Sequence, residues 1–360
     1  MAAAYVVYLL QQQRDAERNL RQQRVFRTPR TLDTIADNHL ARYYRLPRPA
    51  MERLCEALAP ALRRPTARNC ALPVDAQVLL ALRFYASGSF QSVVGDVGNM
   101  SQTSASRIIN SVSSALCNFA EKGIKFPVTP QAAMRTARGF AEINGFPKVL
   151  GCIDGTHIAL KIAKKDQNIY RNRKGYDSLN VQAVCNASNE ITQLTVKWPG
   201  STHDSFMWRN CDLSEKFEAG VMPDGWLLGD AGYPLQPWLM TPFRKPKEEE
   251  GEEAYNMCLT KTRQVIERTF GILKSRFRCL DRSGGVLQYT PSVCCRIIVA
   301  CVVLHNYCIR HHVSLTDPPV VESDEEEEEE EEDEEDRPST ARDTPAGIVV
   351  RRNLVNEVFK

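Results

Sequence analysis

The period of the apolar positions changes once along the chain, near Lys148. Before this residue, apolar side chains recur at helical spacing in Val74–Tyr85 and Gln102–Leu116, and a shorter helix is predicted between them at Ser89–Val97. The four residues Gly98–Ser101 form a turn that ends on serine, a residue type that caps helices. Helix, helix, turn and helix in this order predict an all-α helix-turn-helix region.

After Lys148 the pattern becomes that of strands. Four segments are apolar runs or alternate with period two: Val149–Ile158, Leu179–Cys185, Ile191–Trp198 and the shorter Trp226–Leu228. Two long helices follow, of which Thr260–Arg278 is amphipathic and basic and Val293–Ile309 is apolar. Strands followed by helices predict an α/β fold in which helices flank a mixed sheet.

We therefore divide the chain into a helical basic region at 1–73, a helix-turn-helix-like domain at 74–147, an α/β domain at 148–314 and a tail at 315–360. The tail is expected to be disordered, because its run Glu322–Asp336 holds 14 acidic residues and no lysine or arginine. Outside this run the chain has 46 basic and 30 acidic residues, an excess of 16 positive charges. This excess favours a polyanionic partner such as DNA, although basic proteins that bind no nucleic acid also exist.

Secreted and membrane proteins are not expected. The apolar opening Ala2–Leu10 is short and has no basic residue before it, so we interpret it as the start of a helix, and no stretch reaches the roughly 18 uninterrupted apolar residues of a membrane span. The twelve cysteines have no C-x-x-C spacing, which favours free thiols. A zinc site at Cys301, His305, Cys308 and His311 remains an alternative to a plain apolar core helix.

Two aspartates interrupt apolar strands where packing gives no reason for a charge. Asp154 follows a largely apolar run and precedes glycine, and Asp230 repeats this pattern after Trp226–Leu228. A buried carboxylate has to be paired or bound to a cation, because its desolvation costs several kcal/mol. Two acids at strand ends of one sheet can converge on Mg²⁺ or Mn²⁺, as metal-assisted cleavage of phosphodiesters requires.

Two further acids are weaker candidates when taken singly. Arg263, Glu267 and Lys274 fall on one helix face, so a metal-binding acid would lie between two phosphate-binding cations. Taken singly, this spacing favours an ordinary salt bridge between Arg263 and Glu267. Asp204 follows a strand in a predicted loop, beside His203, where aspartate often caps a turn.

Candidate DNA contacts lie in two segments. The first turn of the predicted recognition helix carries polar and basic side chains suited to base edges and phosphates, namely Gln102, Thr103, Ser104, Ser106 and Arg107. Arg171, Arg173 and Lys174 either grip phosphates or solvate a turn. A small helical packing domain that only resembles a helix-turn-helix remains the alternative for the first segment.

Several strings of the chain resemble the PIF/Harbinger transposases, in the family's order and across residues 75 to about 312. They are Cys-Ile-Asp-Gly-Thr-His-Ile (152–158), Asn-Arg-Lys-Gly-Tyr-Asp-Ser-Leu-Asn (172–180), Trp-Pro-Gly-Ser-Thr-His-Asp-Ser (198–205), Leu-Gly-Asp-Ala-Gly-Tyr-Pro (228–234), Val-Ile-Glu-Arg-Thr-Phe-Gly (265–271) and Leu-His-Asn (304–306). The spacing of Arg263, Glu267 and Lys274 is also similar to a signature of bacterial insertion-sequence transposases, but Thr260 stands where that signature has tyrosine.

The resemblance implies that 148–314 is an RNase H-like nuclease domain with a DDE catalytic set. Asp154, Asp230 and Glu267 would be the catalytic acids and metal ligands, with Asp204 near the same Mg²⁺ or Mn²⁺. It further implies residence in the nucleus, with the cytoplasm as a second location, and a separate Myb-like DNA-binding partner. Self-association is left open.

The sequence therefore predicts a metal-dependent DNA endonuclease, either a transposase or a transposase-derived protein. The alternative is a DNA-binding or scaffold protein whose nuclease site is unused, and a zinc-dependent regulator is a third hypothesis. An intact set of acids favours the first.

Overall fold

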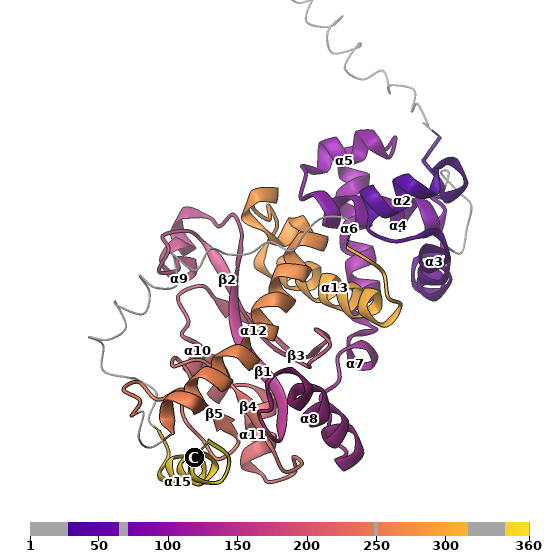
Figure 1. Cartoon of the computed structure of the whole chain (residues 1–360). Helices are drawn as coiled ribbons and strands as arrows, with labels where there is room; N and C mark the ends of the chain where they lie inside the picture. Colours follow the sequence, from indigo (N-terminus) through magenta and orange to yellow (C-terminus); the bar gives the residue numbers. More distant parts are fainter. Residues whose placement is uncertain (1–27, 65–70, 248–250, 316–342, 360) are drawn as a thin grey trace, which may run out of the picture.

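The computed structural model describes residues 28–64, 71–247, 251–315 and 343–359. The helix expected at the start of the chain and the acidic run lie outside these residues. Helices make up the first part of the fold: α2 (Asp37–Tyr44), α3 (Arg48–Leu62), α4 (Val74–Ser87), α5 (Gln91–Val97), α6 (Gln102–Cys117), α7 (Ala120–Gly123) and α8 (Pro130–Asn144) (Figure 1). The three helices predicted between Val74 and Leu116 are confirmed, whereas α8 was not predicted.

The turn before α6 forms as its sequence indicates. Ser101 is the N-cap of α6, and its hydroxyl accepts a hydrogen bond from the Ser104 amide at 3.3 Å. One face of α6 is buried, including Ile108, Ile109 and Val112. Gln102, Thr103 and Arg107 lie on the exposed side, and Ser104 is half-buried.

A five-stranded mixed sheet forms the second part. Its strands are β1 (Val149–Ala159), β2 (Ser178–Cys185), β3 (Ile191–Pro199), β4 (Trp226–Leu228) and β5 (Leu239–Met240), in the order β3-β2-β1-β4-β5. β1 pairs antiparallel with β2 and parallel with β4, so the sheet is mixed at its central strand. The remaining helices are α9 (Gln167–Tyr170), α10 (Asp204–Arg209), α11 (Asp212–Glu218), α12 (Glu252–Arg276), α13 (Pro291–Arg310) and α15 (Pro345–Leu354). The predicted α/β fold with flanking helices is confirmed.

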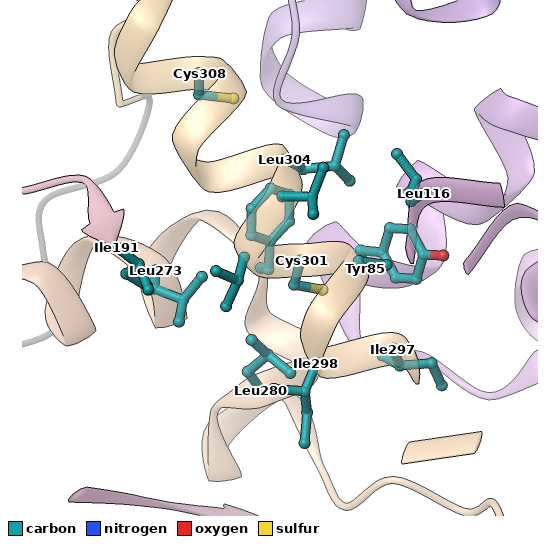
Figure 2. Packing of buried hydrophobic residues seen from close by; sticks show 14 of the residues in the cluster. Tyr85, Leu116, Ile191, Leu273, Leu280, Ile297, Ile298, Cys301, Leu304 and Cys308 are labelled. Atoms are coloured by element: carbon teal, nitrogen blue, oxygen red, sulfur yellow. The ribbon is translucent and has the colours of Figure 1, made fainter. Parts of the chain in front are cut away.

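Helix α13 is the central helix of the core. Figure 2 shows Ile297, Ile298, Cys301 and Leu304 of α13 packed among side chains of α4, α6, α12 and β3. It is long and apolar enough to cross a membrane, but 61% of its most apolar window is buried inside the protein, which is the environment of a core helix. The N-terminal helices and the α/β part thus share one hydrophobic core across the predicted boundary at residue 148.

The cysteines of α13 pack in this core. Cys301 and Cys308 are fully buried among apolar side chains, and the eleven described cysteines are free thiols. Among the described residues no group of three or more His, Cys, Asp or Glu side chains is placed to hold a metal ion. We therefore interpret these cysteines as core residues, in place of the zinc alternative.

The Leu-His-Asn string fastens α13 to the sheet. Asn306 accepts a hydrogen bond from the Ile191 amide at 2.8 Å and donates to the Ile191 carbonyl at 2.7 Å and the Gly123 carbonyl at 3.0 Å. His305 Nε2 lies 2.7 Å from the Asn189 carbonyl oxygen, and burial lowers the pKa of this histidine to about 4. The string thus ties α13 to α7 and to the turn that leads into β3.

The predicted disordered tail is wrong for its last residues. Residues 345–354 form α15, and Leu354 and Val355 are buried in the main core. Arg351 donates to the carbonyls of Thr241 and Pro242, both at 3.1 Å, and its guanidinium carbon lies 3.9 Å from the centre of the Phe243 ring. The acidic composition of the neighbouring run concealed a short amphipathic segment that has an apolar surface to cover.

Candidate active site

Strand pairing brings Asp154 and Asp230 to one level of the sheet. Cys152 of β1 lies opposite Leu228 of β4 in the parallel pair, and each aspartate follows two residues later. Because side chains alternate along a strand, a step of two residues keeps the same face. The two acids that the sequence singled out are therefore neighbours, and both are half-buried.

Asp204 joins them from a third segment. It is the first residue of α10, where the sequence predicted a loop, and its Oδ1 accepts a hydrogen bond from Asn180 Nδ2 of β2 at 3.1 Å. The same amide group donates to the Thr202 carbonyl at 2.9 Å, so Asn180 holds the turn before α10 against the sheet. Gly155 makes this approach feasible, because a Cβ at this position would lie 2.6 Å from Asp204 Oδ1.

Glu267 enters the site through an arginine. On α12, Arg263 Nη2 lies 2.9 Å from Glu267 Oε1, and Arg263 Nη1 donates to Asp154 Oδ2 at 3.0 Å. The guanidinium group thus lies between the first and third predicted catalytic acids, and its side chain is only 16% exposed. The salt bridge between Arg263 and Glu267 that the spacing suggested is present, but it is half-buried and includes an acid from β1.

The electrostatics show that these acids act on one another. Burial raises the pKa of Asp154 well above its usual range, Arg263 opposes this shift, and the charges of Asp230 and Asp204 add to it. Burial likewise raises the pKa of Tyr233 well above that of an ordinary tyrosine, and Asp204, Asp154 and Asp230 raise it further. Negative charge is therefore concentrated at this edge of the sheet.

Sequence reasoning missed the polar side chains that support the acids. Asn180 and Gln182 are buried at alternate positions of β2, opposite His157 and Gly155 of β1. Gln182 donates to the Tyr233 hydroxyl at 3.1 Å. Buried amides at period two within an apolar strand were the available signal, since a buried polar group needs a partner on that face.

The donor set fits a hard divalent cation in its chemistry. All four acids offer carboxylate oxygens, which Mg²⁺ and Mn²⁺ prefer. Burial raises the pKa of Asp154 most, and the charges of Asp230 and Asp204, which add to this shift, are charges that such a cation would offset. In this structure Arg263 provides the positive charge between Asp154 and Glu267. Release of Asp154 or Glu267 by Arg263 would free a carboxylate oxygen for such a cation.

The predicted DNA contacts are distributed unevenly. Arg171, Arg173 and Lys174 are exposed on the turn before β2, where Arg171 also lies 3.8 Å from Asp177. Lys274 is only 6% exposed, so its side chain lies in the interior and the expectation that it faces DNA is wrong in this structure. The last turns of α12 are covered by the core on nearly all sides, which a helical-spacing argument could not reveal.

Comparisons with known proteins show which family the chain is similar to. A family model described as DDE superfamily endonuclease matches residues 153–306, a range that contains all four acids. The chain is 42% identical over 289 residues to a Homo sapiens protein named "Putative nuclease HARBI1", covering 80% of this chain and 82% of that protein, and it is 38% identical over 284 residues to the Xenopus laevis protein of the same name, covering 79% and 82%.

A plant protein is a more distant relative. "Protein ALP1-like" of Arabidopsis thaliana is 25% identical over 265 residues, which cover 69% of this chain and 64% of that protein. No solved structure matches at the same level of significance. From the identity and coverage of the animal relatives, the chain belongs to the family of Harbinger transposase-derived nucleases, within the DDE superfamily of endonucleases.

Proposed function

We propose that this protein is a divalent-metal-dependent DNA endonuclease that hydrolyses phosphodiester bonds with Asp154, Asp230 and Glu267. The observation that carries the proposal is the convergence of Asp154, Asp230 and Asp204 from β1, the end of β4 and α10, with the charges of Asp230 and Asp204 raising the pKa of Asp154. Three acids from distant parts of a chain have no packing reason to meet, because like charges repel at close range.

The roles of the residues follow from their places. Asp154 and Asp230 would be the principal ligands of Mg²⁺ or Mn²⁺, with Glu267 as third acid and Asp204 as a further ligand or an orienting acid. When bound, the metal would activate the attacking water and stabilise the leaving oxygen. Asn180 holds Asp204 in place, and Arg263, once released from an acid, would offer its guanidinium to the substrate phosphate.

We extend the proposal to the rest of the molecule. The order and mixed pairing of the strands, with helices packed on the sheet, support an RNase H-like assignment of residues 148–314. The exposure of Gln102, Thr103 and Arg107 at the start of α6 supports a helix-turn-helix surface for DNA or for a Myb-like partner. Action in the nucleus is the location that fits a DNA substrate.

Nicking of supercoiled plasmid by the full chain tests the activity. With Mg²⁺ or Mn²⁺ the wild type should nick, whereas Asp154→Asn and Glu267→Gln should lose at least 100-fold in rate, since each removes one charged ligand without changing size. Asp212→Asn is the matched control, because Asp212 is an exposed acid on α11 whose side chain is 86% exposed.

Cleavage that persists in EDTA, or that survives both substitutions, would contradict the proposal. If the wild type does not cleave with either metal, even with a Myb-like DNA-binding protein added, the protein is instead a DNA-binding scaffold with an unused site. Binding of Mn²⁺ followed by electron paramagnetic resonance gives a second measurement, in which Asp154→Asn should weaken binding and Asp212→Asn should not.

A further inference from the structure

Four arginines line a pocket outside the candidate active site. Its volume is about 340 Å³, and it lies where α2, α4 and the segment after α12 meet. The arginines come from all three: Arg42 and Arg45 from the end of α2, Arg83 from α4 and Arg278 from the short helix Arg278–Leu280. In Figure 1, α2 and α4 lie at the opposite end of the molecule from β4 and β5.

Close backbone packing holds the walls of the pocket in place. Gly88, in the left-handed conformation at φ 67°, ends α4, and a Cβ on it would lie 2.5 Å from the Gly284 carbonyl oxygen. A Cβ on Gly284 would in turn lie 2.0 Å from the Arg278 carbonyl oxygen. Because both contacts need glycine, the end of α4 and the turn at residue 284 are locked together, and the arginines on either side are held at a fixed separation.

Three of the four guanidinium groups, those of Arg42, Arg83 and Arg278, are oriented by contacts other than carboxylates. Arg83 and Arg42 lie 4.8 and 5.4 Å from the centre of the Tyr43 ring, and Arg278 donates to the Ser283 hydroxyl at 2.8 Å. Of the residues that the structure describes, none offers Arg42, Arg83 or Arg278 a carboxylate within 4.0 Å. The ends of α2 and α4 carry only about half a negative charge each, so Arg42, Arg83 and Arg278 already exceed what two helix ends require.

An anion with several oxygens fits this arrangement best. Guanidinium groups bind phosphate in a forked geometry with two parallel hydrogen bonds. The hydroxyls of Ser87 and Ser283 on the pocket wall donate to the Arg83 carbonyl and the Asp281 carboxylate, so the arginines are the donors that the pocket offers. We propose that this pocket binds a backbone phosphate of the DNA substrate, as an anchor separate from the catalytic acids. The inference rests on the proposed function for the identity of the polyanion.

Helix α12 connects the candidate active site with the wall of the pocket. Glu267 and the end of α12 at Arg276 are nine residues apart, and Arg278 follows directly. A helix rises 1.5 Å per residue, so Arg276 lies about 14 Å along the axis of α12 from Glu267. A bound phosphate there would fix the duplex relative to the acids through one rigid helix.

Fluorescence anisotropy with a labelled duplex of about 30 base pairs tests the inference. Binding to the full chain is measured in EDTA over a range of KCl concentrations, so that it does not depend on cleavage. Arg278→Gln should weaken binding about tenfold and reduce the slope of log affinity against log salt by about one, the effect of losing one phosphate contact. Arg138→Gln, which removes an arginine 83% exposed on α8, should change the affinity less than twofold.

A second pair of variants leaves all four arginines in place. Ser283 is exposed, so both Ser283→Glu and Ser283→Gln should fold, which circular dichroism checks. Ser283→Glu should weaken binding as Arg278→Gln does, because its carboxylate would occupy the pocket, whereas Ser283→Gln should bind as the wild type does.

The inference is overturned if the wild type shows no salt-dependent binding, or if Arg278→Gln and Ser283→Glu bind with unchanged affinity and slope. A peptide with the sequence of residues 322–336 gives a further test. The inference is overturned if this peptide binds the wild type but not Arg278→Gln while the wild type and Arg278→Gln bind the duplex equally well, since the occupant of the pocket would then be the chain's own acidic run. These outcomes are distinct from failure of the proposed function. Pocket-dependent binding without metal-dependent cleavage contradicts only the nuclease, and cleavage with pocket-independent binding contradicts only this inference.

Discussion

Gly155 determines how closely Asp204 approaches Asp154. A Cβ at residue 155 would lie 2.6 Å from Asp204 Oδ1 and 3.2 Å from Asn180 Oδ1. The backbone at Gly155 is regular β1 strand paired with Gln182, so alanine fits the local conformation. Substitution of Gly155 by alanine should therefore move the Asp204 carboxylate with little effect on the fold.

The displacement can be estimated from the contact. Ordinary contact between carbon and oxygen begins at about 3.4 Å, so Oδ1 has to move by about 0.8 Å, which would also stretch its hydrogen bond from Asn180. A misplacement of about 1 Å in a catalytic group costs up to about 100-fold in rate. We expect Gly155→Ala to reduce metal-dependent nicking by about 10- to 100-fold, equivalent to about 1.4–2.7 kcal/mol of transition-state stabilisation.

The assay compares initial nicking rates at saturating Mg²⁺ with thermal unfolding of each variant. Gly123→Ala is the matched control, because the nearest atom to a Cβ there is 3.9 Å away. It should nick at the wild-type rate. Binding of Mn²⁺ by Gly155→Ala should weaken in parallel if Asp204 is a ligand, and should stay unchanged if Asp204 only orients the site.

A double-mutant cycle with Asp204→Ala isolates the contact. Once the Asp204 carboxylate is absent, Gly155→Ala should add less than about 0.5 kcal/mol, because it has no carboxylate left to displace. Two additive losses would refute the reasoning, since Gly155 would then act through another group. A folded Gly155→Ala variant with wild-type nicking would refute it as well, because the position of Asp204 would not matter to the reaction.

Three predictions concern stability. Asn306→Ala should lower the free energy of unfolding in urea by about 3 kcal/mol, since it leaves the buried backbone groups of Ile191 unpaired, and a loss below 1 kcal/mol would contradict this role. Burial lowers the pKa of His305 from 6.5 to about 4, so between these pH values the unfolded chain binds a proton that the folded chain does not. The free energy of unfolding should therefore fall as the pH drops from about 6.5 to about 4, by at most about 3 kcal/mol. His305→Gln should flatten this dependence in urea titrations at pH 7 and 5. Leu354→Ala should cost about 2–3 kcal/mol because α15 packs on the body, whereas a disordered end would make it neutral.

The sequence predicted those parts of the fold whose evidence is periodic. The helices from Val74 to Leu116 and the strands from Val149 to Trp198 appear within one or two residues of the predicted bounds. Asp154 and Asp230 were identifiable because a charge inside an apolar strand requires a partner. β5 has only two residues, too few for any alternation to be read.

The rest depends on contacts between distant segments. Nothing along the chain states that Gly155 lies against Asp204, or that Arg263 pairs with Asp154 from 109 residues away. Lys274 follows Glu267 at a spacing that suggested a shared exposed face, but the core closes around the end of α12 and buries its side chain. Helical spacing gives the direction of a side chain about its axis and not the environment into which it points.

The same limit explains why one family motif can contain residues of the candidate active site and another can contain residues that only stabilise the core. Asp154 and His305 both belong to strings that resemble the family, yet Asp154 lies among the acids of the site and His305 lies in the core with a neutral imidazole beside the Asn189 carbonyl. Their pKa values are both shifted mainly by burial, so the shift alone does not separate them. What separates them is the kind of group nearby: the carboxylates of Asp230 and Asp204 act on Asp154, whereas His305 bonds to the Asn189 carbonyl and the charges that act on it are those of Arg276 and Glu190. A catalytic role for a residue of such a string therefore has to be argued from the metal-binding carboxylates gathered around it. On that ground the acids of β1, of α10 and after the end of β4 qualify, whereas the histidine of α13 does not.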